Sequence, residues 1–197
     1  MRLEVKNLSS GYRKRQVIGN INFTLEEGEV VCILGPNGSG KTTLFKSILG
    51  LLDLQQGEVL LLGENIKNWS RQNLARHIAY IPQAHAPSFG YKVLEIVLMG
   101  RAPYLKQFAS PGKRDEEIAL KALDRLNITH LKDKVYTELS GGERQLVLIS
   151  RALAQQSKFL IMDEPTSNLD FGNQMLVLQQ IASLAKQGYA VLMSSHN

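Results

Sequence analysis

Gly35-Pro36-Asn37-Gly38-Ser39-Gly40-Lys41-Thr42-Thr43 is the stretch that decides the fold of this chain. It fits G-x-x-x-x-G-K-[ST], the pattern of a phosphate-binding loop. Five apolar residues, Val30 to Leu34, precede it and predict a buried parallel strand. Apolar residues at helical spacing follow it. Strand, glycine-rich loop and helix, in this order, are the context that such a loop needs.

The residue types of this loop explain how it would hold a phosphate. Its three glycines allow a tight bend, so that backbone N–H groups converge on phosphate oxygens. The following helix adds the partial positive charge of its N-terminus. Lys41 would reach the β- and γ-phosphates, and Thr42 would place its hydroxyl on Mg²⁺. The alternative is an ordinary strand–turn–helix, and the correct flanks on both sides disfavour it.

The composition is that of an ordinary globular domain. The chain has 197 residues, of which 44% are hydrophobic and 21% charged, enough for one good-sized domain. No apolar run approaches the roughly 18 residues of a membrane span, and the N-terminus does not have the form of a signal peptide. The single cysteine, Cys32, suits a reducing compartment and is expected in the core, because it lies in the predicted buried strand.

The net charge of +5 raises the question of a nucleic-acid or membrane-surface partner. The basic residues are scattered, however, and the densest cluster is only Arg13-Lys14-Arg15. Aromatic residues do not alternate with basic ones as in proteins that stack bases. A solvated basic face, or help in binding ATP, is the favoured interpretation.

The order of the patterns predicts an α/β fold of one domain. Alternating residues at 2–8 and 21–25 predict a small antiparallel β layer before the phosphate-loop core. A helical block, at about 84–157, is inserted between the parts of a mostly parallel sheet. Within this block we expect Asp115 to cap a helix, with acids in its first turn. Further predicted elements are strands at 59–62, 78–81, 159–162 and 189–193, and helices at 70–76 and 171–187.

Two acidic residues follow the buried strand at 159–162. Asp163 and Glu164 therefore lie at the carboxyl end of a parallel strand, where α/β sheets bind ligands. One carboxylate would hold Mg²⁺, and the next would polarise an attacking water. Two solvated acids after a strand are the alternative, which the phosphate-binding loop disfavours.

A second glycine pair lies in Leu139-Ser140-Gly141-Gly142-Glu143. Ser140 and Glu143 fit a capping box, which predicts the start of a helix. Glycine disfavours a helix by about 1 kcal/mol relative to alanine. Two of them in a first turn therefore indicate that something needs close access to the backbone here.

With these motifs in place, the whole chain resembles the ATP-binding cassette of an ABC transporter. Residues 139–145 are similar to the family's LSGGQ signature, with Glu143 in place of the commoner glutamine. The resemblance implies that Tyr12 stacks on adenine and that Gln83 is the Q-loop glutamine. It also matches residues 167–170 to the D-loop and His196 to the switch histidine.

The resemblance assigns the roles of the site residues. Glu164 would be the general base, His196 would contact the γ-phosphate, and Gln83 would contact Mg²⁺ or water. The metal ligands would be Thr42, Asp163 and Gln83. The ATP-binding set would be Tyr12, Gly35, Pro36, Asn37, Gly38, Ser39, Gly40, Lys41, Thr42, Thr43, Ser140, Gly141 and Gly142.

The resemblance also implies partners, cofactors and a location. Two cassettes would sandwich two ATP molecules with Mg²⁺, each signature facing the phosphate loop of the other chain. The helical block would meet a membrane permease, which places the chain on the cytoplasmic face of the cell membrane as a peripheral subunit, served indirectly by a substrate-binding protein. Residues 97–104 resemble the importers of metal chelates: iron–siderophore, haem, cobalamin and, in some members, molybdate. No nucleic acid is expected as a partner.

Other functions remain open at this point. A soluble ABC-type ATPase acting on nucleic acid or ribosomes is the main alternative, although the segment between Gln83 and Ser140 holds no heptads and the chain has one cassette. An unrelated kinase or GTPase is disfavoured by the signature, and an exporter ATPase remains possible. Members of the family usually continue well past the switch histidine. We therefore expect a shortened cassette with an exposed sheet edge, lower stability and impaired turnover.

Overall fold

The first sheet of the molecule is antiparallel and precedes the core. The computed structural model describes residues 1–13, 15–83, 90–106 and 109–196. The sheet has the strand order β2-β1-β4-β5. Its strands are β1 (Arg2–Tyr12), β2 (Arg15–Glu26), β4 (Leu54–Leu61) and β5 (Glu64–Asn65). The predicted antiparallel layer is thereby confirmed, with strands longer than the alternating patterns indicated.

The second sheet is parallel and has the order β3-β8-β7-β6. Its strands are β3 (Val30–Leu34), β6 (Ile78–Ile81), β7 (Phe159–Met162) and β8 (Ala190–Ser195). All residues of β7 are buried, as predicted. Because all four strands run in one direction, the segments that follow them gather at one edge.

Val30–Leu34 is a parallel strand, as predicted, but the prediction that it is buried was wrong. Among the described residues β3 pairs only with β8, so it is an edge strand. Val31 and Ile33 pack against the core that α1 (Lys41–Ile48) shares with the antiparallel sheet, whereas Cys32 and Leu34 on the other face are exposed. Cys32 is therefore not the core residue that was expected.

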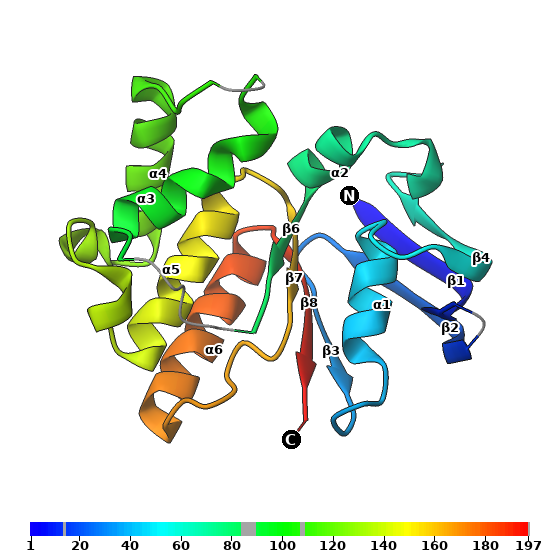
Figure 1. The fold of residues 1–197 in the computed structure, drawn as a ribbon. Coiled ribbons are helices and arrows are strands. Elements are labelled where there is room, and N and C mark those ends of the chain that lie inside the picture. The colour runs from blue at the N-terminus through cyan, green and yellow to red at the C-terminus, as the bar shows by residue number, and fades with distance from the viewer. Residues whose placement is uncertain (14, 84–89, 107–108, 197) are drawn as a thin grey trace.

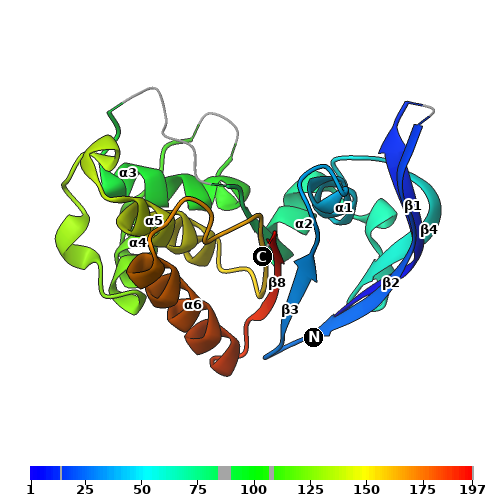
Figure 2. The same cartoon turned by 90° about the horizontal axis from the view of Figure 1, so that it is seen from below.

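The predicted helical block forms a separate side of the molecule. It contains α3 (Val93–Leu98), α4 (Lys113–Arg125) and α5 (Gly141–Ala154), and α6 (Phe171–Lys186) packs beside α5. Figures 1 and 2 show these helices on one side of the parallel sheet and the antiparallel sheet on the other. Short 3₁₀ turns lie at Ile66–Asn68, Met99–Tyr104, Thr129–Leu131 and Tyr136–Glu138.

Two helix starts test the predicted caps. Ser70 caps α2 (Arg71–His77) by accepting a hydrogen bond from the Asn73 N–H, as expected. The prediction for Asp115 was wrong, because α4 begins two residues earlier with Gly112 as its N-cap. Asp115 lies in the first turn, where it accepts hydrogen bonds from the Gly112 N–H and from Arg101.

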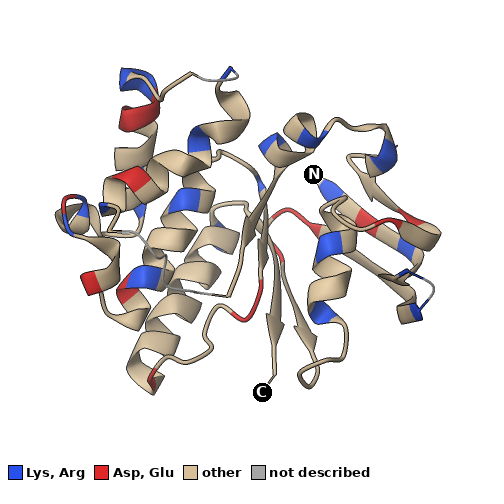
Figure 3. Cartoon of the chain, viewed as in Figure 1, with Lys and Arg blue, Asp and Glu red and all other residues tan. Residues whose placement is uncertain are grey.

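Charges and apolar residues are distributed as in a globular domain. One buried cluster lies among the helices and the far face of the parallel sheet, and the other lies between that sheet and the antiparallel one. In Figure 3 basic and acidic residues are interspersed over both sides. No helix among the described residues is long and apolar enough to cross a bilayer.

Candidate functional site

The phosphate-binding loop leaves β3 and enters α1 as predicted. Gly40 caps α1 with φ 99°, a left-handed conformation that favours glycine, and an added Cβ there would lie 2.5 Å from a methyl of Ile18. Lys41 is buried, and its Nζ donates to the carbonyl of Gly35 at 2.6 Å and to that of Pro36 at 3.2 Å. The ammonium group therefore lies inside the loop that precedes it.

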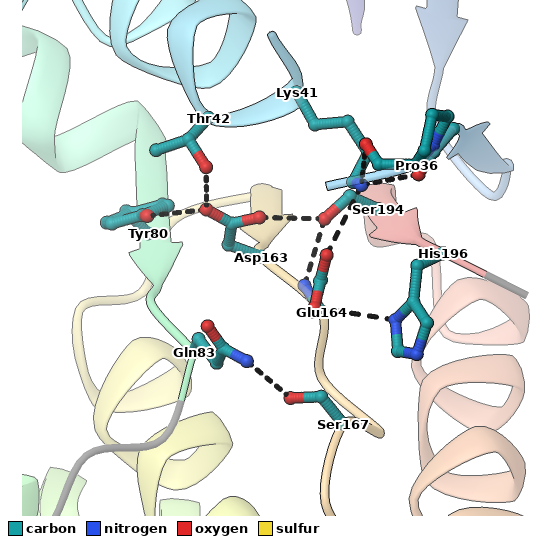
Figure 4. Close-up of polar contacts among 11 residues, drawn as sticks. Pro36, Lys41, Thr42, Tyr80, Gln83, Asp163, Glu164, Ser167, Ser194 and His196 are labelled. Carbon is teal, nitrogen blue, oxygen red and sulfur yellow. Dashed lines mark hydrogen bonds and ion pairs between the residues drawn. The ribbon is translucent and has the colours of Figure 1, made fainter. Parts of the chain in front are cut away.

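Asp163 follows β7 and is held by three hydroxyl groups (Figure 4). The Thr42 hydroxyl donates to Oδ2 at 2.8 Å, and the Tyr80 hydroxyl donates to the same oxygen at 3.2 Å. The Ser194 hydroxyl donates to Oδ1 at 2.8 Å. This arrangement satisfies a nearly buried carboxylate with neutral donors and fixes its plane beside the start of α1.

Tyr80 and Ser194 belong to the site although the sequence did not predict a role for either. Burial first, and the neighbouring Asp163 second, raise the pKa of Tyr80, so its hydroxyl stays protonated and donates. Tyr80 lies on β6 and Ser194 on β8, the two strands that flank β7. Ser194 meets Asp163 because Met162 pairs with Met193 and the residue after each faces the other. This register is visible in the folded sheet and not in the sequence.

Glu164 lies between two basic side chains. Its Oε1 is 3.3 Å from the Lys41 Nζ, and its Oε2 is 3.5 Å from the Nδ1 of His196. Its backbone has φ 48°, an uncommon conformation for a residue with a side chain. The Glu164 N–H donates to the Ser194 hydroxyl at 2.9 Å, so one buried serine contacts both acids.

These side chains border a cavity of about 420 Å³, a size typical of small-molecule sites. Tyr12 lies half exposed in its lining, as a residue that stacks on a base would. Val17 also lines it and was not predicted. The full lining is Tyr12, Val17, Asn37, Gly38, Gly40, Lys41, Thr42, Thr43, Gln83, Asp163 and Glu164.

Gln83 lies two residues after the end of β6, just before the helical block. Its Nε2 donates to the Ser167 hydroxyl at 3.0 Å, and so it links the predicted Q-loop to the predicted D-loop. The six residues that follow Gln83, 84–89, lie outside the described residues.

The signature segment lies at the start of α5, apart from the cavity. The capping box is present: the Ser140 N–H donates to Glu143 at 2.8 Å and the Glu143 N–H to the Ser140 hydroxyl at 3.3 Å. These bonds lower the pKa of Glu143. A Cβ on Gly142 would lie 2.1 Å from the amide oxygen of Asn173, so α6 is one element that approaches this backbone closely.

The donor set at the cavity suits Mg²⁺. The Thr42 hydroxyl and the Asp163 carboxylate are hydrogen-bonded neighbours, and Gln83 adds an amide oxygen to the same lining. Mg²⁺ prefers such oxygens and, when it accompanies phosphates, needs only one or two from the protein. Among the described residues, no three His, Cys, Asp or Glu side chains are arranged to hold a metal ion.

Comparison with known proteins agrees with this geometry. The family model described as ABC transporter matches residues 18–167. An ABC transporter ATP-binding protein of Haemophilus influenzae is 50% identical over all of this chain and 75% of its own length. An iron chelatin transport ATP-binding protein of Helicobacter pylori is 41% identical over all of this chain and 78% of its own.

Solved structures agree as well. An inward-facing ABC transporter described as of the metal-chelate type superposes with a TM-score of 0.87 at 39% identity, over 99% of this chain and 73% of that one. The match includes both the antiparallel and the parallel sheet of the fold. The chain belongs to the ABC transporter family, as one of the ATP-binding cassettes that hydrolyse ATP to power transport.

Proposed function

We propose that this chain binds Mg²⁺–ATP in the cavity beside α1 and hydrolyses it to drive import of a metal chelate through a membrane permease. The observation that carries the catalytic part is the position of Glu164, whose carboxylate lies between Lys41 and His196 at the edge of the phosphate-binding loop. A carboxylate in that place is within reach of a water that attacks the terminal phosphate.

The phosphate-binding loop and the rest of the cavity lining would bind different parts of ATP. The N–H groups of the loop and of the α1 N-terminus would hold the phosphates. Tyr12 would stack on the base at the exposed end of the cavity. Lys41 would leave the carbonyls of Gly35 and Pro36 and bind the β- and γ-phosphates.

The ion pair between Lys41 and Glu164 would determine when the Glu164 carboxylate is free to act as a base. The Lys41 ammonium is 3.3 Å from the Glu164 carboxylate, and the two opposite charges compensate each other. A triphosphate carries more negative charge and competes for the lysine, which releases the carboxylate toward water. His196 would then contact the γ-phosphate, and its Nδ1 is already 3.5 Å from Glu164.

Mg²⁺ would be held by the Thr42 hydroxyl and the Asp163 carboxylate, directly or through water, with Gln83 beside it. When bound, it neutralises charge on the phosphate oxygens. Tyr80 and Ser194 would keep the Asp163 carboxylate oriented while the Thr42 hydroxyl turns to the metal.

A second chain would complete the site. Ser140, Gly141 and Gly142 do not line the cavity of their own chain, yet they begin a helix whose N–H groups are suited to an anion. We infer that they face the phosphate loop of a partner cassette in a dimer formed with ATP.

The membrane partner would meet the helical block. A mainly apolar cavity of about 210 Å³ lies between α3, α5 and the end of β6. Gln83 lines both this cavity and the ATP cavity, so a helix of the permease seated here would be in contact with the nucleotide site. In that arrangement the chain would lie on the cytoplasmic face of the membrane, as a peripheral subunit.

The cargo is inferred from relatives. The Helicobacter pylori relative is named for iron chelatin transport, and the superposed structure is described as of the metal-chelate type. Residues 97–104 also resemble the corresponding segment of metal-chelate importers. The alternative of an ATPase acting on nucleic acid has no counterpart among these relatives, and basic and acidic residues are interspersed along the ribbon of Figure 3.

Steady-state ATP hydrolysis tests the proposal. We expect Glu164→Gln to lose at least about hundredfold in kcat while it still binds ATP, because a general base contributes 10²–10⁴-fold. Glu116→Gln, an exposed acid of α4, is the control and should hydrolyse like the wild type. Chelation of Mg²⁺ should abolish hydrolysis. If Glu164→Gln turned over ATP normally, the proposed role of this site would be wrong.

A further inference from the structure

A second polar cavity, of about 360 Å³, lies at the opposite end of the parallel sheet. It is bounded by α4, by the turn between α5 and β7, and by the start of β8. At about 3.3 Å per residue along β8, Tyr189 is roughly 16 Å from Ser194 of the ATP site. Its lining is Ile118, Lys121, Ala122, Arg125, Leu153, Gln156, Ser157, Lys158 and Tyr189.

The lining has three cations and no acid. Among the described residues, no carboxylate oxygen lies within 4.0 Å of the charged nitrogens of Lys121, Arg125 or Lys158. Glu27 lies near enough to Lys158 for that charge to lower its pKa slightly. The main cause of the lowered pKa, however, is the N-terminal amine, which is hydrogen-bonded to Glu27 at 2.9 Å. Like charges gathered around one cavity repel each other unless an anion compensates them.

Two of the cations are ordered around one buried ring. The Arg125 guanidinium donates to the Tyr189 hydroxyl at 2.5 Å, and its Cζ is 5.8 Å from the ring centroid. The Nζ of Lys158 is 5.1 Å from the same centroid. Cation–π contacts of this kind hold long side chains in place at the cavity instead of leaving them free in solvent.

Apolar side chains complete the lining of this cavity. Ile118 and Ala122 belong to α4, which also carries Lys121 and Arg125, and Leu153 belongs to α5. The cavity therefore offers apolar surface beside its cations.

We propose that this cavity binds a phosphomonoester with a small apolar or aromatic part. The three cations match a dianionic phosphate, and the apolar side chains with Tyr189 match the organic part. The ligand would join Lys121 and Arg125 of the helical block to Lys158 of the sheet core. Binding here does not depend on hydrolysis of ATP, so the inference stands apart from the proposed function.

Calorimetric titration with phenyl phosphate tests this site. The titration is made with saturating Mg²⁺–ADP, so that the phosphate-binding loop is occupied. We expect saturable binding that weakens about tenfold in Lys121→Gln/Lys158→Gln, since two attractive charges are lost at the cavity. Lys113→Gln, on the same helix but outside the cavity, should bind like the wild type.

Hydrogen exchange locates the ligand. Phenyl phosphate should slow exchange at residues 121–125 and 156–158, and should leave residues 35–43 unchanged. Absence of binding to the wild type, equal binding to the double variant, or protection at residues 35–43 alone would each overturn the inference.

Sedimentation with vesicles of phosphatidic acid or of phosphatidylcholine distinguishes a lipid headgroup from a soluble ester as the source of the phosphate. Capture by the former, lost in the double variant, assigns the phosphate to a lipid, and no capture assigns it to a soluble ester.

Discussion

Replacing Ser194 with alanine should damage the ATP site more than the loss of one small side chain suggests. The Ser194 hydroxyl is buried, donates to Asp163 at 2.8 Å and accepts from the Glu164 N–H at 2.9 Å. Loss of a bond to a charged partner costs about 1.5–3 kcal/mol, and an unsatisfied N–H about 1 kcal/mol more. The variant should therefore be about 3 kcal/mol less stable, which lowers Tm by roughly 6–12 °C for a chain of this size.

The catalytic effect of the same change follows from the conformation of Glu164. The backbone of this residue is left-handed, and the Ser194 hydroxyl holds its N–H. Released from that bond, the carboxylate should move, and a shift of about 1 Å costs on the order of a hundredfold in rate. We expect kcat to fall about tenfold to hundredfold with little change in KM, because the phosphate-binding loop is untouched.

Matched variants separate this role from simple destabilisation. Ser150 is equally buried and donates only to the Ala122 carbonyl, at 3.3 Å. Ser150→Ala should lose about 0.5–1 kcal/mol and keep full activity. Ser194→Thr keeps the hydroxyl and should recover most of kcat. If Ser194→Ala melted like Ser150→Ala and hydrolysed ATP at the wild-type rate, the Ser194 hydroxyl would not hold the two acids of the site.

Two further predictions concern packing away from the cavity. Gly142→Ala should destabilise the chain by about 1–3 kcal/mol by overpacking against Asn173, and the added substitution Asn173→Ala should restore most of the loss in a urea titration. Arg101 is buried and is paired with Asp115 at 2.9 Å. Removal of one partner of such a pair costs about 3–5 kcal/mol when it is fully buried, so Arg101→Met should cost about 2–4 kcal/mol by the same measurement, since Asp115 is partly exposed. The exposed Arg71→Met should cost less than about 0.5 kcal/mol, and equal losses in the two arginine variants would contradict this prediction.

The phosphate-binding loop could be predicted because its requirements are local. The spacing from Gly35 to Thr43 fixes the turn, the helix start and the lysine within one short segment. The acids after β7 were predictable for a similar reason, since carboxyl ends of parallel strands share one edge. The capping box at Ser140 is also local, and it is present in the structure.

Contacts between strands that are distant in the sequence could not be predicted from such local patterns. Tyr80 reaches Asp163 across 83 positions, and no motif marks it. The exposure of Cys32 depends on β3 lying at a sheet edge, and strand order cannot be read from a run of apolar residues. The glycines of the signature predicted close access to the backbone correctly, but the side chain that approaches Gly142, Asn173 of the same chain, could not be identified.

The mass of Glu164→Gln in solution, with and without Mg²⁺–ATP, shows whether two chains share one ATP site. In the proposed dimer, Ser140 of one chain faces the phosphate-binding loop of the other. Light scattering after size-exclusion chromatography should therefore give a dimer with ATP and a monomer without it, and Ser140→Arg in the same background should remain monomeric. A monomer that binds ATP at saturation and never dimerises would contradict the shared site.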